Sequence, residues 1–192
     1  ASGADHAWNY NVYKSKSPGN KSKEIAELTI IEKETSSLSA IRSGVNTGRI
    51  MAESANIARD LVNEPPNVLT PAELASRAKS MMRNLPVKVK VLGLKEIEKL
   101  KMGAFLGVAY GSRQEPRFII MEYAGNPASK KTTGLIGKGI TFDSGGISLK
   151  PSNAMGDMKS DMAGAAAVIA AMRIIGILRP KVNVTALAPA TE

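Results

Sequence analysis

The chain has 192 residues, enough for one ordinary domain with a hydrophobic core, and its 43% hydrophobic content is typical of a soluble globular protein. It contains no cysteine, which excludes disulfides and thiolate metal sites, so a bound metal would need oxygen or nitrogen ligands. The net charge of +9 is compatible with a polyanionic partner, but most cations are scattered. The loose basic stretch from Lys14 to Lys23 is better interpreted as a solvated connection than as a nucleic-acid site.

The ends of the sequence and its apolar runs bear on where the protein works. No apolar run approaches the roughly 20 residues that cross a bilayer, and the start lacks the order of a signal peptide. We therefore expect a cytoplasmic protein without a membrane partner. The missing initiator Met and the apolar run directly before Thr191-Glu192 favour an internal fragment of a longer chain. His6, the only histidine, lies in the amino-terminal segment, and we do not expect it to act as a ligand or base.

The first half of the chain predicts one short strand and two helices. Residues 26–31 resemble a strand, and helical spacing of apolar residues from Ser39 to Asn63 predicts a long helix that ends at Glu64-Pro65-Pro66. Thr70, Pro71 and Glu73 have the pattern of a helix N-cap, first turn and capping box. The helix that they open should bury four apolar residues. These are Leu74, Ala75, Ala78 and Met82.

In the second half, strands alternate with helices. Val87, Val89 and Val91 alternate with lysines, which is typical of a half-exposed strand, and a short helix from Leu94 to Met102 should end at Gly103. The remaining predicted elements are strands at 117–123 and 133–137, a helix at about 157–178 and a strand at 182–188. This order predicts an α/β fold with a mixed, largely parallel sheet flanked by helices.

A charged, glycine-rich stretch lies where chemistry is expected. In α/β sheets, sites gather beyond the carboxyl ends of strands, and residues 137–150 follow such an end. Glycines allow a tight backbone that could bring Lys138, Asp143, Lys150 and Asp161 toward one point. Asp161, near the start of an Ala-rich helix, could also serve only to interact with the helix dipole.

Two carboxylates and a lysine leave two interpretations open. Asp143 and Asp161 offer the oxygen ligands that hard divalent cations prefer. Lys138 could join them only as the neutral amine, and a neighbouring dication favours loss of its proton. In the alternative interpretation, Lys138 simply pairs with Asp143, and the spacing alone slightly favours this ion pair.

Two rival motifs fit poorly. The phosphate-loop pattern requires Gly-Lys followed by Ser or Thr, whereas here Lys138 is followed by Gly139. Phe142-Asp143-Ser144-Gly145 resembles the signature of aspartic proteases, but only one copy is present. The long Ala-rich helix that follows also disagrees with an almost wholly β fold, so we set both rivals aside.

The motif set resembles the leucyl aminopeptidase family, also called the cytosol aminopeptidase family. The resemblance is carried by residues 137–146 with Lys150 and by Lys159-Ser160-Asp161-Met162. Further matching blocks are Asn63-Glu64-Pro65-Pro66-Asn67 with Thr70-Pro71, Met102 to Leu106 with Gly111-Ser112, and Ala190-Thr191-Glu192. The spacing between the blocks also agrees, so the resemblance covers most of the chain.

The resemblance implies a metal-dependent aminopeptidase that releases leucine and similar amino-terminal residues from peptides. It implies two divalent metal ions, Mn²⁺ or Zn²⁺, with Lys138 and Asp161 binding one metal and Asp143 bridging both. Lys150 would be the catalytic lysine beside the substrate carbonyl, and Met158 would line the pocket for the first side chain. The family pattern continues with an Asp-Ala-Glu-Gly-Arg segment that supplies further ligands, and this sequence ends before it. Ala163 stands where the family usually has glycine.

The resemblance also divides the chain and suggests its partners. It predicts the end of an amino-terminal domain at 1–38, a linking helix at 39–62 and the first part of the catalytic domain at 63–192. The fragment alone should bind at most one metal weakly and hydrolyse little, whereas the complete enzyme should act on peptides as a hexamer. As the alternative function, motivated by the charge of +9, we keep a basic nucleic-acid-binding protein on a peptidase scaffold.

Overall fold

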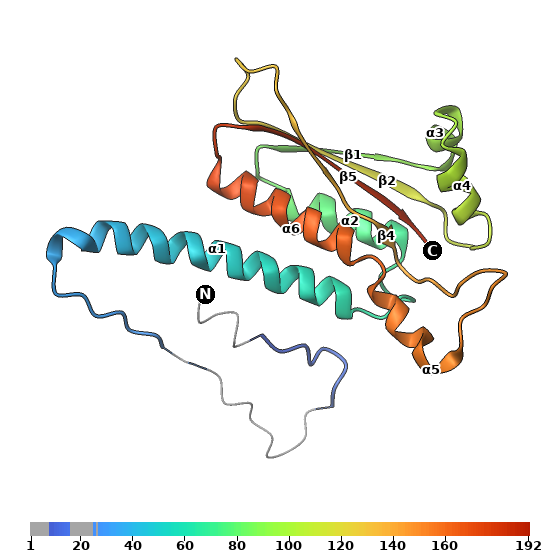
Figure 1. Ribbon diagram of the computed structural model, residues 1–192, viewed down its shortest axis with the longest axis horizontal. Helices are drawn as coiled ribbons and strands as arrows, with labels where there is room; N and C mark the ends of the chain where they lie inside the picture. Colours follow the sequence, from blue (N-terminus) through green and yellow to red (C-terminus); the bar gives the residue numbers. More distant parts are fainter. Residues whose placement is uncertain (1–7, 16–24, 26) are drawn as a thin grey trace.

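The computed structural model describes residues 8–15, 25 and 27–192 (Figure 1). The predicted strand at 26–31 is wrong for residues 27–31, which form no strand; residue 26 lies outside the described residues, as does His6. The described part of that segment is exposed, with Ile31 at 88%, and makes no sheet pairing. A strand needs a partner backbone, and apolar composition alone does not supply one.

The two predicted helices of the first half are confirmed. α1 spans Leu38–Asn63, preceded by the short 3₁₀ helix η2 (Thr35–Ser37), and α2 spans Pro71–Met81. The Thr70 side chain accepts a hydrogen bond from the Glu73 N–H at 3.3 Å, as expected of the N-cap. The four apolar residues predicted to be buried by α2 are all in the core.

Five strands form one mixed sheet. They are β1 (Val87–Leu92), β2 (Arg117–Ala124), β3 (Thr133–Ile136), β4 (Gly139–Ile140) and β5 (Asn183–Thr191). The order is β1-β2-β5-β3, with β4 also paired to β5. The mixed α/β class is confirmed, but most of the pairing is antiparallel, between β1 and β2 and between β2 and β5, rather than parallel.

The helices between β1 and β2 explain this difference. α3 (Leu94–Lys99) and α4 (Gly103–Ala109) return the chain to the same end of the sheet, so that Phe118 pairs with Leu92. A helix between two strands suggested a parallel crossover, but these two short helices form a connection at one end. Gly103 begins α4 and does not merely close the preceding helix.

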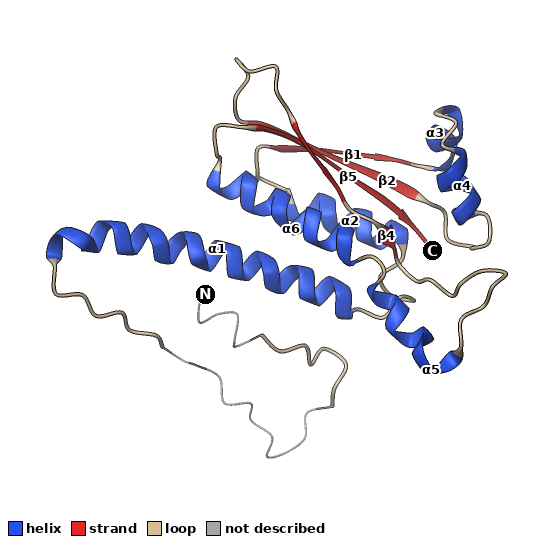
Figure 2. Ribbon diagram, in the orientation of Figure 1, coloured by secondary structure: helices blue, strands red, loops and turns tan. Residues whose placement is uncertain are grey.

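Helices on one face of the sheet bury the main core (Figure 2). α6 (Ala163–Leu178) and α2 pack on the sheet, and α1 packs along α6 as an outer layer. The core combines side chains of these helices with inward-facing residues of β2 and β5, among them Ile119, Met121 and Ala186. α3 and α4 cover one end of the opposite face around Ile97 and Leu106.

The predicted helix at 157–178 is interrupted near its start. α5 (Ser152–Met155) and the 3₁₀ helix η3 (Gly156–Ser160) precede α6, with Asp161 and Met162 between them. Among the described residues, the stretch Ser152–Leu178 is long and apolar enough to cross a membrane by length and composition, and an 18-residue window within it has a mean hydropathy of 1.8. Because α6 buries Ala165, Ile169 and Met172 against the sheet and α1, its apolar composition is that of a core helix.

Candidate metal and active site

The site is built at the carboxyl ends of three strands. β3 and β4 both run parallel to β5, so that the residues after each strand emerge at one edge of the sheet. The Gly137 N–H donates to the Leu187 carbonyl at 3.0 Å, and the Thr141 N–H donates to the Thr191 carbonyl at 2.8 Å. These bonds fix the backbone on both sides of Lys138 and just before Asp143.

A direct backbone contact sets the distance between this edge and α6. A Cβ atom on Gly137 would lie 2.3 Å from the Gly164 carbonyl oxygen, and one on Gly164 would lie 2.9 Å from the Lys138 nitrogen. The Ala165 N–H donates to the Lys138 carbonyl at 2.8 Å. The first turn of α6, and therefore Asp161 just before it, is held against the strand end by main-chain atoms.

Lys138 and Asp161 meet across this contact. Lys138 Nζ lies 2.8 Å from Asp161 Oδ2, with the lysine side chain 61% exposed and the aspartate side chain 21% exposed. Asp161 Oδ2 itself is buried, and the ion pair lacks the angles of a hydrogen bond, so this oxygen has no hydrogen-bond partner in the described part of the chain. The Lys138 ammonium is therefore the positive group that this buried oxygen has among the described residues, and a metal ion is a chemically suitable replacement for it.

Asp143 and Lys150 form a second pair in the glycine-rich loop. Lys150 Nζ lies 2.6 Å from Asp143 Oδ2 and donates to the Asp143 carbonyl at 3.1 Å, while the Gly145 N–H donates to Oδ1 at 2.9 Å. Gly145 and Gly146 have φ of 94° and 66°, which only glycine adopts readily, and they turn the loop back so that the Lys150 N–H reaches the Ser144 carbonyl.

The electrostatics of the loop keep Asp143 ionised. The hydrogen bond from Lys150, followed by that from the Gly145 N–H, holds the pKa of Asp143 below its ordinary value. The positive charge of Lys138 acts in the same direction, which indicates that the two pairs form one electrostatic cluster. An ionised carboxylate is the form that binds a metal.

The structure thus pairs the four charged residues that the sequence singled out, two by two, with Lys138 near enough to Asp143 for its charge to act on that carboxylate. The simple Lys138–Asp143 ion pair is not formed, since Lys138 pairs with Asp161 and Asp143 pairs with Lys150. Met158, half-buried in η3, accepts a backbone hydrogen bond from the Asp161 N–H at 3.2 Å. The individual roles of Lys138, Asp143, Lys150, Met158 and Asp161 stay predictions.

The donor set suits one hard divalent cation. Two carboxylates, one of them with a buried oxygen lacking a donor, match the oxygen preference of such ions. Within the described residues, no group of three acidic, histidine or cysteine side chains lies close enough together to hold a metal ion. A third protein ligand beside the two carboxylates would therefore have to be Lys138. The residues present therefore have the chemistry that one divalent cation requires.

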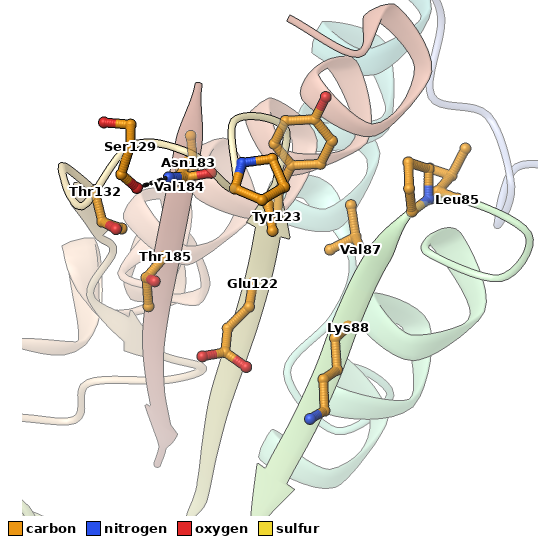
Figure 3. A pocket seen from close by; sticks show the side chains of 13 residues that line it. Leu85, Val87, Lys88, Glu122, Tyr123, Ser129, Thr132, Asn183, Val184 and Thr185 are labelled. Atoms are coloured by element: carbon orange, nitrogen blue, oxygen red, sulfur yellow. Dashed lines mark hydrogen bonds between the residues drawn. The ribbon is translucent and has the colours of Figure 1, made fainter. Parts of the chain in front are cut away.

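A hollow lies at the other end of the sheet (Figure 3). It has a volume of about 690 Å³ and is lined by residues of the amino-terminal ends of β1 and β5 and the carboxyl end of β2, including Lys88, Glu122 and Asn183. Asn183 is occupied there in holding the carbonyls of Asn126, Ser129 and Lys131. No cluster of carboxylates lines this cavity, and we assign it no part in the chemistry.

A second charged cluster was not anticipated from the sequence. Glu64, whose side chain is only 8% exposed, lies 2.5 Å from Arg77 Nη1 and accepts a hydrogen bond from Tyr13. The hydroxyl of Tyr10 is buried beside it, and this burial, together with the Glu64 charge, raises the pKa of Tyr10 to about 12. Trp8 donates to Asp60 at 2.8 Å. The segment Glu64-Pro65-Pro66 indicates a helix stop and matches the family pattern, but neither signal predicts that Glu64 is buried beside Arg77 and Tyr13.

Known proteins resemble the chain over nearly its full length. Residues 56–192 match the cytosol aminopeptidase family, catalytic domain. The chain is 46% identical over 191 residues to a probable cytosol aminopeptidase of Alkaliphilus oremlandii, covering 99% of the chain and 38% of that protein. It is 44% identical over 185 residues to the one of Alkaliphilus metalliredigens, covering 96% of the chain and 37% of that protein.

A solved structure agrees with the fold. The bottromycin maturation enzyme BotP in complex with Mn superposes with a TM-score of 0.82 at 33% identity, covering 98% of this chain and 38% of BotP. The chain thus spans less than two fifths of the length of the relatives that it matches. On the match over residues 56–192 and the convergence of the predicted residues, the chain belongs to the cytosol aminopeptidase family.

Proposed function

We propose that this chain contributes part of the active site of a metal-dependent aminopeptidase that removes leucine and similar residues from the amino termini of peptides. The observation that carries the proposal is the meeting of the Lys138–Asp161 and Lys150–Asp143 pairs at one edge of the sheet. Membership of a peptidase family and the Mn complex of BotP support metal-dependent hydrolysis.

Three side chains would hold the metal. Asp161 would use the buried oxygen that has no hydrogen-bond donor, and Asp143 would bind as the carboxylate that its lowered pKa maintains. Lys138 would have to lose a proton and exchange its ion pair with Asp161 for a metal bond, for which its exposed position leaves room. A bound divalent metal, Mn²⁺ or Zn²⁺, supplies an acidified water and polarises the amide carbonyl.

Lys150 would act on the substrate itself. Its ammonium lies 2.6 Å from Asp143 Oδ2, which places a positive charge next to the metal ligands. A fixed positive charge there would stabilise the negative charge that develops on the carbonyl oxygen during attack. Asp143 would orient the Lys150 ammonium, and Met158, on the segment leading to Asp161, would contact the first side chain of the peptide.

The names of the relatives support a cellular setting, and the family resemblance of the motifs suggests an assembly. We propose that the protein works in the cytoplasm, as the name of its relatives implies, and that the complete enzyme assembles as a hexamer. Because the relatives are more than twice as long as this chain, we expect the second metal position to be completed by residues that this sequence lacks.

The test compares this chain with a version extended through the source gene beyond the codon for Glu192. With Mn²⁺ or Zn²⁺ the extended protein should hydrolyse leucine amide, and Asp143→Ala should lower kcat at least a hundredfold, whereas the 192-residue chain should show little hydrolysis. An extended protein that is inactive with both metals would contradict the proposed function. Rapid hydrolysis by the short chain, abolished by Asp143→Ala, would contradict its inactivity.

A further inference from the structure

Lys159 differs from the other two lysines of the charged region in what it contacts. Lys138 and Lys150 pair with carboxylates, whereas the half-buried Lys159 donates from Nζ to the main-chain carbonyl of Asn63 at 2.9 Å. The two residues are 96 positions apart in the sequence. The bond therefore joins η3, which leads directly to Asp161, to the carboxyl end of α1.

The carbonyl that Lys159 binds is one that the helix cannot satisfy. Asn63 is the last residue of α1, and the next residue, Glu64, is extended with ψ of 138°. The last carbonyls of a helix lack intrahelical donors and carry the negative end of its dipole, which favours a cation. Another of these carbonyls, that of Asp60, accepts from the Glu64 N–H at 3.1 Å, and the Asn63 side chain donates to the Arg59 carbonyl at 2.8 Å.

The end of α1 is itself a fixed point. Glu64 follows Asn63 directly and is held by Arg77 at 2.5 Å and by Tyr13. Arg77 belongs to α2 and also pairs with Glu73 at 2.8 Å in the same helix. The ion pair between Glu64 and Arg77 therefore links the end of α1 to α2. An ammonium bound to this corner is anchored to a part of the molecule that does not depend on the metal site.

Asp161, in contrast, has few constraints of its own. Its carboxylate pairs with the exposed ammonium of Lys138 but has no hydrogen bond at Oδ2 within the described residues, and its N–H donates to the Met158 carbonyl at 3.2 Å. On the carboxyl side, the segment is fixed by the contact of Gly164 with Gly137 and by the bond from the Ala165 N–H to the Lys138 carbonyl. On the amino side, Lys159 is the side chain that ties η3 to another element.

We infer that Lys159 is a positioning residue, which holds η3 on the end of α1 and thereby sets the place of the Asp161 carboxylate relative to Lys138 and Asp143. This inference rests on the proposed metal site for its consequence, but not for the contact itself. Residues that orient metal ligands from outside typically change metal affinity by about ten- to a hundredfold when they are removed.

The experiment uses the 192-residue chain and three variants. Lys159→Met keeps the length of the side chain and removes the donor, Lys159→Arg keeps a cationic donor, and Lys130→Met removes the same charge from an exposed loop at the other end of the sheet. Mn²⁺ affinity is measured from the electron paramagnetic resonance signal of the free ion. Exchange of the Asp161 amide hydrogen and the thermal midpoint are measured without metal.

We expect Lys159→Met to weaken Mn²⁺ binding about tenfold and to speed exchange of the Asp161 amide at least tenfold, with the thermal midpoint within a few degrees of the unmodified chain. In Lys159→Arg, the Mn²⁺ affinity and the Asp161 exchange rate should both stay within about threefold of those of the unmodified chain. Lys130→Met should change neither the affinity nor the exchange rate. Unchanged exchange in Lys159→Met, or equal loss in Lys159→Arg, would overturn the inference. A fall in the metal-free midpoint of more than about ten degrees would also overturn it, because Lys159 would then stabilise the whole fold.

The two readouts separate this inference from the proposed function. If the unmodified chain binds no Mn²⁺, the metal site fails, yet the exchange rate of Asp161 still decides whether Lys159 holds the segment. If the unmodified chain binds Mn²⁺ and Lys159→Met binds it equally well, the metal site stands and the positioning role fails.

Discussion

Two carboxylate clusters, one around Glu64 at the corner between α1 and α2 and one around Asp161 between η3 and α6, differ in how far their carboxylates accept hydrogen bonds. Glu64 is almost buried, and although burial alone would raise its pKa, hydrogen bonds from Tyr13 and Arg77 outweigh this and lower the pKa. Asp161, at 21% exposure, has a cation nearby but no hydrogen bond at its buried oxygen.

The difference separates a structural cluster from a site with capacity to bind. A carboxylate whose acceptor sites are filled by fixed donors gains nothing from a metal ion and stabilises the fold. A carboxylate with a buried but unfilled oxygen lowers stability until a ligand arrives. Charge content alone does not distinguish the two, because each cluster contains acids and cations in similar numbers.

The largest expected effect tests the structural cluster. Glu64→Ala should reduce the free energy of unfolding by about 3 kcal/mol, because it leaves Arg77 and Tyr13 without their shared, nearly buried partner. Denaturant unfolding measures this change. Glu73→Ala is the matched control, since Glu73 also pairs with Arg77 but is 42% exposed, and it should cost less than about 1 kcal/mol. If the two variants lost the same free energy of unfolding, the burial of Glu64 would not explain its contribution to stability.

The metal site should respond in the opposite way. Asp161→Asn should weaken Mn²⁺ binding at least tenfold, or about 1.4 kcal/mol, while the free energy of unfolding changes by less than about 1 kcal/mol. The amide is neutral and coordinates a hard cation poorly, but it removes a buried charge without a hydrogen bond. Asp157→Asn, an exposed acid four residues earlier, serves as the control in the same titration. If both variants bind Mn²⁺ like the unmodified chain, Asp161 is not a ligand.

The smallest effect concerns pH. Because Lys150 and then Gly145 lower the pKa of Asp143 in the folded chain below its ordinary value of 3.8, their stabilisation is present above that pH and is lost as the pH falls through the lowered pKa. Lys150→Met should raise the pKa of Asp143 and cost less than about 1 kcal/mol at pH 7, since both side chains are about a third exposed. Unfolding curves of the two chains should converge near pH 2; a constant difference at all pH values would assign the loss to packing.

Much of the fold could be predicted from the sequence where a local signal decides it. The Thr70-Pro71-Glu73 start of α2 and the Pro65-Pro66 stop of α1 are chemical signals of helix ends, and the structure confirms both. Whether two strands run parallel or antiparallel depends on the end of the sheet at which their connection re-enters it. The sequence of α3 and α4 contains no signal that they bring the chain back to the end at which it left. The break at Asp161-Met162 was likewise hidden, because the apolar pattern continues across it.

For the site, residue types were predictable and pairings were not. Glycine spacing indicated that Lys138, Asp143, Lys150 and Asp161 could converge, and they do. Which lysine meets which carboxylate depends on the register of β3 and β4 beside β5 and on the first turn of α6, both long-range features. The anchoring of Lys159 on Asn63 spans 96 residues and had no sequence signal beyond the presence of a lysine.

The backbone contact between Gly137 and Gly164 has a consequence for redesign. Because main-chain atoms determine the spacing between the strand end and α6, the side chains at Lys138 and Asp161 can be exchanged without moving the segments that carry them. Histidine or cysteine introduced at these two positions would offer nitrogen or sulfur ligands, which softer metal ions prefer, without a change in the backbone that holds them. The paired glycines thus make this edge of the sheet a scaffold on which metal preference can be altered separately from folding.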